Sequence, residues 1–196
     1  MNALENWFCA SAFWRYVTRR ELLPWLLRGA QLGDHILELG AGRGTATFEL
    51  AKLVQQVTSI EYDHKSLAVL AARTVNSNVR SIQGDASTLP FASESFSSAI
   101  AVLMIHHLKT PELQDRAFGE IHRVLRPGGV FIAFEIPNGW FHRIEHFKST
   151  FVPIDPSTVA RRLATVGFSH VTVGSRSAGF RIRAFRESQV SRTPAP

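Results

Sequence analysis

Residues 36–47 read Ile-Leu-Glu-Leu-Gly-Ala-Gly-Arg-Gly-Thr-Ala-Thr, and the rest of the chain is organised around this stretch. A short apolar run is followed by three glycines at alternate positions and then by an amphipathic pattern, which predicts a strand, a tight turn and a helix. Glycine suits such a turn because it adopts left-handed backbone angles without steric cost and lets a ligand approach the main chain. The helix start adds free N–H groups, so the stretch favours a site for a nucleotide-like ligand.

Downstream of this stretch, strand and helix patterns alternate, which predicts an α/β fold with a mostly parallel sheet and right-handed crossovers. The predicted strands are 36–39, 57–61, 79–83, 98–105, 130–135, 171–174 and 179–185, and the predicted helices are 45–55, 65–74, 111–124 and 157–166. The strand at 98–105 is apolar throughout, as a central parallel strand buried on both faces should be. The last two strands are expected to form an antiparallel, hairpin-like pair.

An acidic residue ends the second predicted strand, and another follows the third. Glu61 ends the second strand about 20 residues after the glycines, where a carboxylate can accept hydrogen bonds from both hydroxyls of a ribose. Asp63 is the runner-up for this role, because it lies two residues beyond the apolar run. Asp85 follows the third strand within Gly84-Asp85-Ala86, although an Asp after Gly is also a common turn former.

The glycine spacing distinguishes two kinds of nucleotide site. The dinucleotide fingerprint is GxGxxG, whereas Gly40, Gly42 and Gly44 form GxGxG preceded by Glu38. This pattern resembles motif I of the class I S-adenosylmethionine-dependent methyltransferases. The Gly-Asp-Ala segment followed by Leu-Pro-Phe at 89–91, and Leu-Arg-Pro-Gly-Gly at 125–129, are similar to further segments of that family, in the same order along the chain.

The resemblance implies a Rossmann-like, doubly wound, seven-stranded sheet of order 3-2-1-4-5-7-6 in a single domain, with an antiparallel last strand. The chain looks like the small-molecule, type 11 branch of the family. One departure is Ser97, because the family commonly has an Asp directly after the Phe that opens the fourth strand. The substitution leaves the role of this position in the fold open but does not touch the cofactor site.

The resemblance also implies S-adenosylmethionine as cofactor and S-adenosylhomocysteine as product. In this interpretation Glu38 attracts the ammonium of the methionine part, directly or through water, and Glu61 binds the ribose. Asp85 accepts a hydrogen bond from the adenine amino group, while the backbone N–H of Ala86 meets a ring nitrogen. The implied cofactor-binding residues are Glu38, Gly40, Ala41, Gly42, Glu61, Tyr62, Asp85, Ala86 and Leu103.

Methyl transfer from a sulfonium is an in-line displacement that depends mainly on positioning and on exclusion of water. A base is needed only if the nucleophile must lose a proton. His106 and His107, just past the fourth strand, are the first candidates, and the next are His142, His146 and Glu135. The alternative is that His-His-Leu recurs in this branch for structural reasons, because it accompanies differing reactions.

A metal site is not expected from these histidines. His106 and His107 are adjacent, so a strand-like backbone would point their side chains to opposite faces. The pair His142 and His146 is spaced four residues apart but lacks a supporting carboxylate motif.

The predicted organisation is an N-terminal helical cap over 1–33, a methyltransferase domain over 34–186 and a flexible tail over 187–196. Within the domain, 137–156 forms an insert after the fifth strand. Pro24 is expected to separate two helical pieces of the cap. The cap aromatics either pad one face of the sheet or form a lid with an aromatic wall. The candidate acceptor-binding residues are Trp14, His107, Trp140 and His142.

The net charge of +6 lies in the last fifth of the chain, where seven arginines stand against Glu187. Such an end can meet nucleic acid or anionic lipid, but a solvated face is favoured because no aromatic-interleaved basic run or known nucleic-acid motif accompanies it. The single Cys9 excludes an internal disulfide and a cysteine-based metal site, and it fits a reducing cytoplasm. No apolar run reaches the roughly 20 residues of a membrane span, and no secretory signal is visible.

These observations favour an enzyme that methylates a small, partly apolar molecule at oxygen, nitrogen or carbon. The family's Asn/Asp-Pro-Pro-Tyr signature for amide or base nitrogens is absent, because Ile-His-His-Leu occupies its place at 105–108. The alternatives are an RNA or lipid-headgroup methyltransferase that uses the arginine-rich end, and a non-catalytic, cofactor-binding regulatory protein. A nicotinamide dehydrogenase is disfavoured by the glycine spacing. The oligomeric state stays open between monomer and homodimer.

Overall fold

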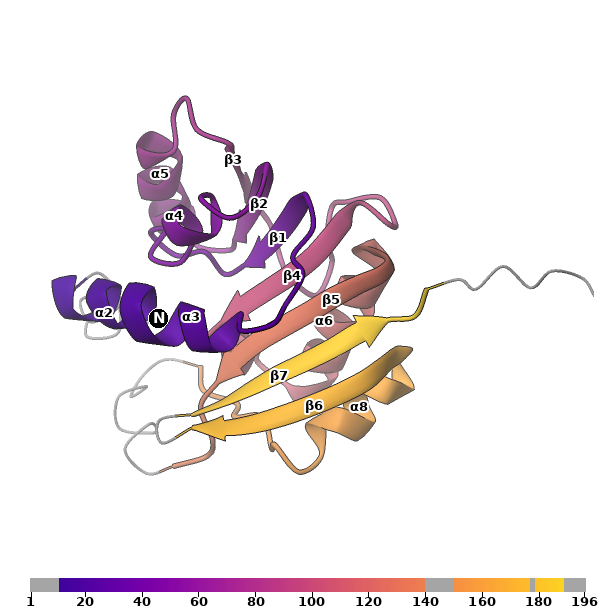
Figure 1. Ribbon diagram of the computed structural model, residues 1–196. Coiled ribbons are helices and arrows are strands. Elements are labelled where there is room, and N and C mark those ends of the chain that lie inside the picture. The colour runs from indigo at the N-terminus through magenta and orange to yellow at the C-terminus, as the bar shows by residue number, and fades with distance from the viewer. Residues whose placement is uncertain (1–10, 140–149, 177–178, 189–196) are drawn as a thin grey trace, which may run out of the picture.

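A computed structural model describes residues 11–139, 150–176 and 179–188, and its centre is one sheet of seven strands in the order β3-β2-β1-β4-β5-β7-β6 (Figure 1). The strands are β1 (His35–Leu39), β2 (Gln56–Glu61), β3 (Val79–Gln83), β4 (Phe96–Val102), β5 (Leu125–Glu135), β6 (Phe168–Arg176) and β7 (Gly179–Arg186). The first five strands are parallel, and β7 runs antiparallel to both β5 and β6. The predicted fold class and strand order are confirmed.

Helices cover both faces of this sheet (Figure 1). They are α2 (Ala12–Val17), the π-helical η1 (Thr18–Leu22), α3 (Leu23–Leu26), α4 (Thr47–Leu50), α5 (His64–Arg73), the 3-10 turn η2 (Ile105–His107), α6 (Pro111–Val124) and α8 (Val159–Thr165). One buried cluster joins α6 and α8 to one face of the sheet, and a second joins α3 and α4 to the other face. Alternate residues of β4 and β5 contribute to the two clusters, as the two-residue period of a strand requires.

The fourth strand differs from its predicted range of 98–105. It begins at Phe96 and ends at Val102, because Leu103 adopts a left-handed φ of 54° and donates its N–H to the Phe134 carbonyl oxygen at 2.8 Å. A residue with a side chain rarely takes this conformation, and it cannot continue a pleated strand. The chain therefore turns at the strand tip, and Ile105 opens η2 instead of ending β4.

Four other predicted ranges are also corrected. The helix predicted over 45–55 contains only α4 as regular helix, with turns on either side. The Pro-Gly-Gly reversal is a bulge inside β5, because Leu125 pairs with Phe96 and the next paired residues are Val130 and Ser98. Strand β6 is longer than predicted at both ends and β7 is longer by one residue, because the two strands pair from Phe168 with Arg186 to Arg176 with Gly179.

The described part of the N-terminal cap is a helical layer packed on the sheet. Leu22, Leu23 and Leu26 are at most 4% exposed and belong to the buried cluster of that face. Pro24 lies in the first turn of α3, as predicted for a boundary, but the helical backbone angles continue across it. The π-helical turn before it, in which the Leu23 N–H bonds the Thr18 carbonyl, marks the change of element.

The arginines of the last strands fasten this cap. Arg181 donates to the Trp25 carbonyl oxygen at 3.0 Å and lies 5.2 Å from the centroid of the Trp25 ring. Arg183 donates to the Arg28 carbonyl oxygen at 2.7 Å. Helix carbonyls near a C-terminus lack intrahelical partners, so cationic donors stabilise this end of α3. Much of the arginine-rich end is therefore used inside the fold.

Ser97 has a clear structural role that the sequence left open. Its hydroxyl donates to the carbonyl oxygens of Leu32 and His35 at 2.7 and 2.9 Å, and it accepts the His35 N–H at 3.0 Å. A Cβ at Gly33, which has a φ of 73°, would collide with this side chain. The serine thus joins the start of β4 to the segment that leads into β1.

Candidate functional site

The glycine turn that follows β1 is left-handed at all three glycines, with φ of 70° at Gly40, 55° at Gly42 and 93° at Gly44. A Cβ at Gly40 would collide with the Met104 side chain, whereas a Cβ at Gly42 would meet nothing within 4 Å. The two glycines therefore serve different needs. Gly40 allows close packing below the turn, and Gly42 leaves its outer side open to a ligand.

Glu38 is buried beneath this turn, with 3% of its surface exposed. Its Oε2 accepts hydrogen bonds of 2.6 Å from the hydroxyls of both Thr47 and Ser59. Burial is the main cause that raises the pKa of this carboxyl to about 6, against the opposing effect of the two hydroxyls. The site thus holds a carboxylate that lacks a cationic partner among the described residues, and a bound ammonium would supply one.

Glu61 ends β2 and is joined directly to the glycine turn. Its Oε2 accepts the Gly42 N–H at 2.7 Å, and its Oε1 accepts the Asp63 N–H at 2.8 Å. Asp63, the alternative ribose ligand, caps helix α5 by accepting the Ser66 N–H at 2.8 Å, and these hydrogen bonds lower its pKa. The geometry therefore favours Glu61 over Asp63 for a ligand that lies across the turn.

Asp85 lies at the next strand end, two residues beyond β3. Its Oδ1 accepts the backbone N–H and the hydroxyl of Ser87 at 2.8 and 2.7 Å, which makes a tight Asx turn. The residue is exposed, Ala86 is buried beside it, and Tyr62 near the same edge is 72% exposed. Oδ1 therefore shapes the turn, while the exposed carboxylate stays accessible to a hydrogen-bond donor.

The turn after β4 is held by a buried carboxylate. Glu135, at the end of β5, accepts the Ile105 and Met104 N–H groups at Oε1 over 2.8 and 3.2 Å, and its Oε2 lies 2.5 Å from His106 Nδ1. Both side chains of this pair are almost fully buried. His106 and Glu135 therefore anchor η2 and the strained Leu103 next to it, and neither carboxylate nor ring faces solvent.

His107 occupies a different environment from its neighbour. Its Nδ1 lies 3.1 Å from the Thr150 carbonyl oxygen and the residue is only partly buried. A carbonyl oxygen can only accept, so Nδ1 carries the hydrogen and the lone pair of the neutral ring lies on Nε2. The two histidine rings lie 4.3 Å apart. The prediction that they point to opposite faces is wrong, because η2 is a 3-10 turn and not a strand.

Several predicted acceptor-side residues cannot be placed. Trp140, His142 and His146 lie outside the described residues. Trp14 is partly buried against the cluster that includes α3. In the parts of the chain that the structure describes, no three metal-ligating side chains gather.

Sequence reasoning missed three residues that hold the site together. Thr47 and Ser59 bind Glu38 from α4 and β2, and Thr150 orients His107 from within the predicted insert. The hydroxyls carried a weak signal, because they occur at positions of otherwise apolar elements. Thr150 carried none, since only the fold brings it next to a residue 43 positions away.

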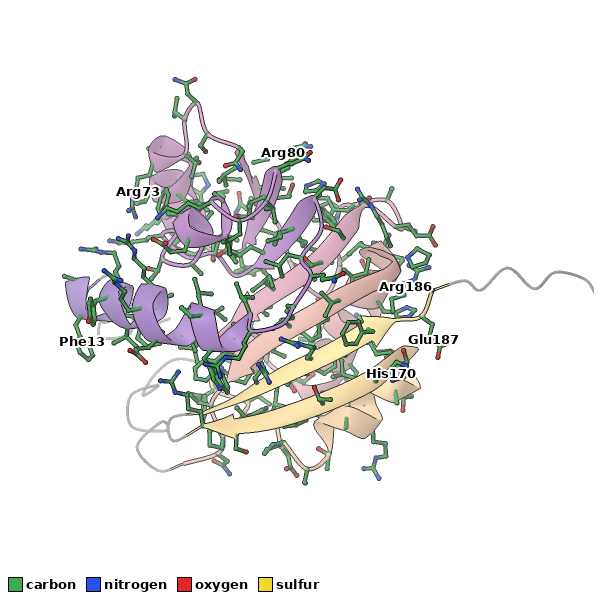
Figure 2. The ribbon with its side chains drawn as sticks, viewed as in Figure 1. Phe13, Arg73, Arg80, His170, Arg186 and Glu187 are labelled. Carbon is green, nitrogen blue, oxygen red and sulfur yellow. The ribbon has the colours of Figure 1, made fainter. Side chains whose placement is uncertain are left out.

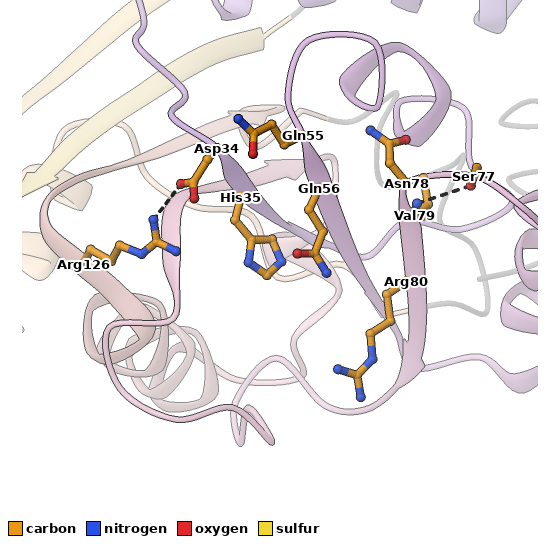
Figure 3. A pocket seen from close by; sticks show the side chains of 9 residues that line it. All are labelled: Asp34, His35, Gln55, Gln56, Ser77, Asn78, Val79, Arg80 and Arg126. Atoms are coloured by element: carbon orange, nitrogen blue, oxygen red, sulfur yellow. Dashed lines mark hydrogen bonds and ion pairs between the residues drawn. The ribbon is translucent and has the colours of Figure 1, made fainter.

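A hollow of about 480 Å³ among the described residues lies at the amino ends of the strands (Figure 3). It is lined by Asp34, His35, Gln55, Gln56, Ser77, Asn78, Val79, Arg80 and Arg126, which come from the amino ends of β1, β2 and β3 and from nearby turns. Ligands of open α/β sheets bind at the carboxyl ends of the strands. The glycine turn and the three acids lie at that edge, so we assign the site there and not to this hollow.

A doubly wound sheet with a glycine turn after β1 and acids at the next two strand ends defines a nucleoside-binding α/β protein. Comparison with known proteins then narrows this class. A family model described as a methyltransferase domain matches residues 37–133, from within β1 to within β5. The chain belongs to this methyltransferase family, in the type 11 branch of the class I S-adenosylmethionine-dependent enzymes, and S-adenosylmethionine is the cofactor of that class.

Individual relatives agree with this assignment. The chain is 25% identical over 195 residues to a demethylmenaquinone methyltransferase of Renibacterium salmoninarum, a match that covers 85% of this chain and 80% of the relative. It is 30% identical to a probable S-adenosylmethionine-dependent methyltransferase of Mycolicibacterium smegmatis, over 70% of this chain and 50% of that protein. The chain spans about half the length of most of the curated relatives that it matches.

The fold is shared with solved structures. A crystal structure of a methyltransferase from Methanosarcina mazei superposes with a TM-score of 0.70 at 19% identity, over 85% of this chain and 98% of that one. At this identity the likeness concerns the fold alone.

Proposed function

We propose that this protein transfers a methyl group from S-adenosylmethionine to a small, partly apolar acceptor by in-line displacement. The observation that carries the proposal is that the open side of Gly42, the Glu61 carboxylate and the exposed Asp85 occupy neighbouring strand ends, with the histidine turn η2 after the adjoining strand β4. These residues match the needs of an adenosine with an amino acid tail. The first relative, a demethylmenaquinone methyltransferase, supports an acceptor with an apolar ring system.

The residues present fit the cofactor by their chemistry. The buried Glu38 carboxylate would hold the cofactor's ammonium group, Glu61 would accept hydroxyl hydrogens, and Asp85 would accept an amino hydrogen. When bound, S-adenosylmethionine supplies a methyl carbon on a sulfonium sulfur. Most of the rate then comes from holding the acceptor in line and excluding water, so few further groups are required.

We assign different roles to the two histidines. His107 is the proposed base, because its Nδ1–H is held by the Thr150 carbonyl and Nε2 is therefore the basic nitrogen. It would take the proton that an acceptor hydroxyl or carbon loses as the new bond to the methyl carbon forms. His106 is a positioning residue, since it is buried against Glu135 and holds η2 in place.

The acceptor side is proposed to include residues 150–152, which lie within the predicted insert. Val152 donates its N–H to the His106 carbonyl oxygen at 2.8 Å, and Gln114 of α6 donates to the Val152 carbonyl oxygen at 2.7 Å. These bonds seat the segment against η2. Trp14, Trp140 and His142 stay proposed as acceptor contacts, and the cap over 1–33, the domain over 34–186 and the tail over 187–196 stay the proposed organisation.

The alternative of a polyanionic acceptor receives no support from the arginines. Arg176 pairs with Glu21 over 3.2 Å, Arg162 with Asp115 over 2.7 Å and Arg186 with Glu94 over 2.6 Å, while Arg181 and Arg183 bind the cap. Five of the six described arginines of this end thus already have partners within the chain, which disfavours their use for phosphate binding. Only an activity assay distinguishes an enzyme from the alternative of a non-catalytic, cofactor-binding protein.

The test is an assay for S-adenosylhomocysteine by mass spectrometry. Purified protein receives S-adenosylmethionine and a panel of acceptors that includes reduced demethylmenaquinone with a short side chain. Production of S-adenosylhomocysteine above the acceptor-free rate supports the proposal. Tight binding of S-adenosylhomocysteine with no turnover on any acceptor would indicate a binding protein instead, and no binding at all would refute both.

The variant His107→Asn sharpens this assay, because Asn keeps a donor for the Thr150 carbonyl and removes Nε2. For an acceptor that must lose a proton we expect kcat to fall about 10²- to 10⁴-fold with unchanged affinity for S-adenosylhomocysteine. The base assignment is refuted if this variant keeps the kcat and the pH profile of the unchanged protein on such an acceptor.

A further inference from the structure

The outer side of the N-terminal helical segment carries two aromatic side chains that do not pad the sheet. Phe13 is 67% exposed and Tyr16 is 62% exposed, although the sequence pattern groups them with the buried cap aromatics. Figure 2 shows Phe13 at the outer end of α2, directed away from the sheet. These two large aromatics lie one helical turn apart, so they expose apolar surface on one face of the segment.

The same face is positively charged. Arg19 and Arg20 follow Tyr16 on the outer side of η1, both exposed. The only acid within residues 11–28 is Glu21, which pairs with Arg176 over 3.2 Å. The carboxylate nearest to Arg19 is Glu49 at 3.7 Å, and Lys52 binds the same oxygen at 2.8 Å. The local charge therefore stays positive after these ion pairs are counted.

The opposite side of this helical segment is packed on the sheet, so the same side of the segment always faces outward. Leu22, Leu23 and Leu26 are buried on the sheet, and Trp25 lies edge-on to the Phe134 ring with centroids 6.1 Å apart. Rotating the segment to hide Phe13 would expose these leucines. The packing of this segment on the sheet therefore directs its aromatic and basic side chains outward.

We propose that Phe13, Tyr16, Arg19 and Arg20, here called the outer stripe, dock the protein onto the surface of an anionic lipid bilayer. Aromatic rings insert at the interface between acyl chains and headgroups, and arginines attract anionic headgroups. This proposal depends on the proposed function in one respect: docking on lipid would give the enzyme access to a partly apolar acceptor dissolved in the bilayer. Within the described ranges every helix is too short or too polar to cross a bilayer, so contact is at the surface.

Other occupants fit the outer stripe less well. A second copy of this chain related by two-fold symmetry would bring the same arginines together, which opposes association. Single-stranded nucleic acid is bound by grooves that follow its backbone. The outer stripe instead lies on a convex helix at the rim of the molecule, which suits a broad, fluid surface (Figure 1).

The position of the outer stripe suits this use. Figure 1 shows α2 beside α4, near the ends to which β1, β4 and β5 point, and Arg19 approaches Glu49 of α4. Because α4 follows the glycine turn, the outer stripe lies on the side of the molecule that holds the proposed site. A protein docked this way would present that edge toward the lipid.

The experiment is co-sedimentation of the protein with lipid vesicles in about 0.05 M salt. One set of vesicles contains phosphatidylcholine alone, and the other contains about 30% phosphatidylglycerol as well. Binding of S-adenosylhomocysteine is measured in parallel. We expect the protein to partition onto the anionic vesicles and not onto neutral ones, and to be released when salt rises to about 0.5 M. The double variant Arg19→Gln/Arg20→Gln should partition about 25-fold less, at roughly fivefold for each arginine. Phe13→Ala/Tyr16→Ala should partition at least about tenfold less.

The matched control is Val75→Ser with Arg80→Gln, which removes one exposed apolar and one exposed basic side chain far from the outer stripe. This control should sediment like the unchanged protein. Equal binding to neutral vesicles, unchanged partition of the outer-stripe variants, or an equal loss in the control would overturn the proposal. Retained S-adenosylhomocysteine binding in every variant shows that the fold is intact and separates this outcome from failure of the proposed methyltransferase function.

Discussion

Replacing Glu38 with Gln should make the protein more stable and its cofactor binding weaker, two effects of opposite sign. The carboxyl is buried, and its pKa of about 6 exceeds the ordinary value of 4.5. In the folded state the proton is therefore held more tightly, so this group's stabilising contribution is complete below about pH 4.5 and is lost as pH rises through about 6. Above that pH the ionised form costs about 2 kcal/mol.

The substitution Glu38→Gln removes this cost while keeping an oxygen that can accept from Thr47 and Ser59. At pH 7.5 we expect the cofactor-free variant to be up to about 2 kcal/mol more stable than the unchanged protein, and at pH 4.5 the gain should vanish. The same change removes the negative charge opposite the ammonium of S-adenosylhomocysteine. Its Kd at pH 7.5 should rise about 30- to 100-fold, as for loss of a charge-assisted hydrogen bond.

Urea unfolding without cofactor between pH 4.5 and 8, together with calorimetric titration of S-adenosylhomocysteine, measures both effects. The unchanged protein should also lose affinity below about pH 6, as Glu38 takes up a proton. Glu49→Gln is the matched control, because Glu49 is partly exposed on α4 and pairs with Lys52. The reasoning fails if Glu38→Gln is destabilised equally at every pH, or if its affinity for S-adenosylhomocysteine equals that of the control.

Three further outcomes follow from the contacts. Gly40→Ala should lower the free energy of unfolding, measured by urea titration, by about 3 kcal/mol. The reason is that this residue has a φ of 70° and that a Cβ here would collide with Met104. An unchanged stability would contradict this packing. Arg181→Met, which keeps the contact with Trp25 but loses the hydrogen bond and the charge, should cost about 1–2 kcal/mol and speed proteolysis of the cap, and equal proteolysis rates would count against the fastening role. Glu61→Gln should weaken S-adenosylhomocysteine binding about tenfold or more, because this carboxylate is proposed to bind the ribose. Free methionine has no ribose, so its ability to compete for the site should not change. An equal loss of affinity for both ligands would place the carboxylate elsewhere than at the ribose.

The elements that the sequence predicts best are those with a strong local signal. The order of strands and helices, the α6 range of 111–124 and the β3 range of 79–83 are confirmed. The second strand, predicted over 57–61, is confirmed to within one residue. In α6 the apolar residues recur at helical spacing up to Val124, so local pattern and tertiary packing agree.

Predicted boundaries fail where a tertiary contact ends or extends an element. The fourth strand stops early because the Leu103 N–H meets the Phe134 carbonyl oxygen of β5. Residues 98–105 are apolar to the end, so the pattern alone contains no stop signal. Similarly, the role of Ser97 depends on one segment, residues 32–35, which lies 62 to 65 positions earlier and accepts its hydrogen bonds.

What the sequence determined by itself is the class of protein, because glycine spacing, the acids at strand ends and the Pro-Gly-Gly segment are local and chemically specific. Only the tertiary structure decided how the site is assembled. Burial sets the pKa of Glu38, a 3-10 turn brings two adjacent histidine rings together, and β7 arginines bind the carbonyls of the cap. Burial, ring geometry and long-range donors depend on distances across the fold, and a sequence pattern does not contain those distances.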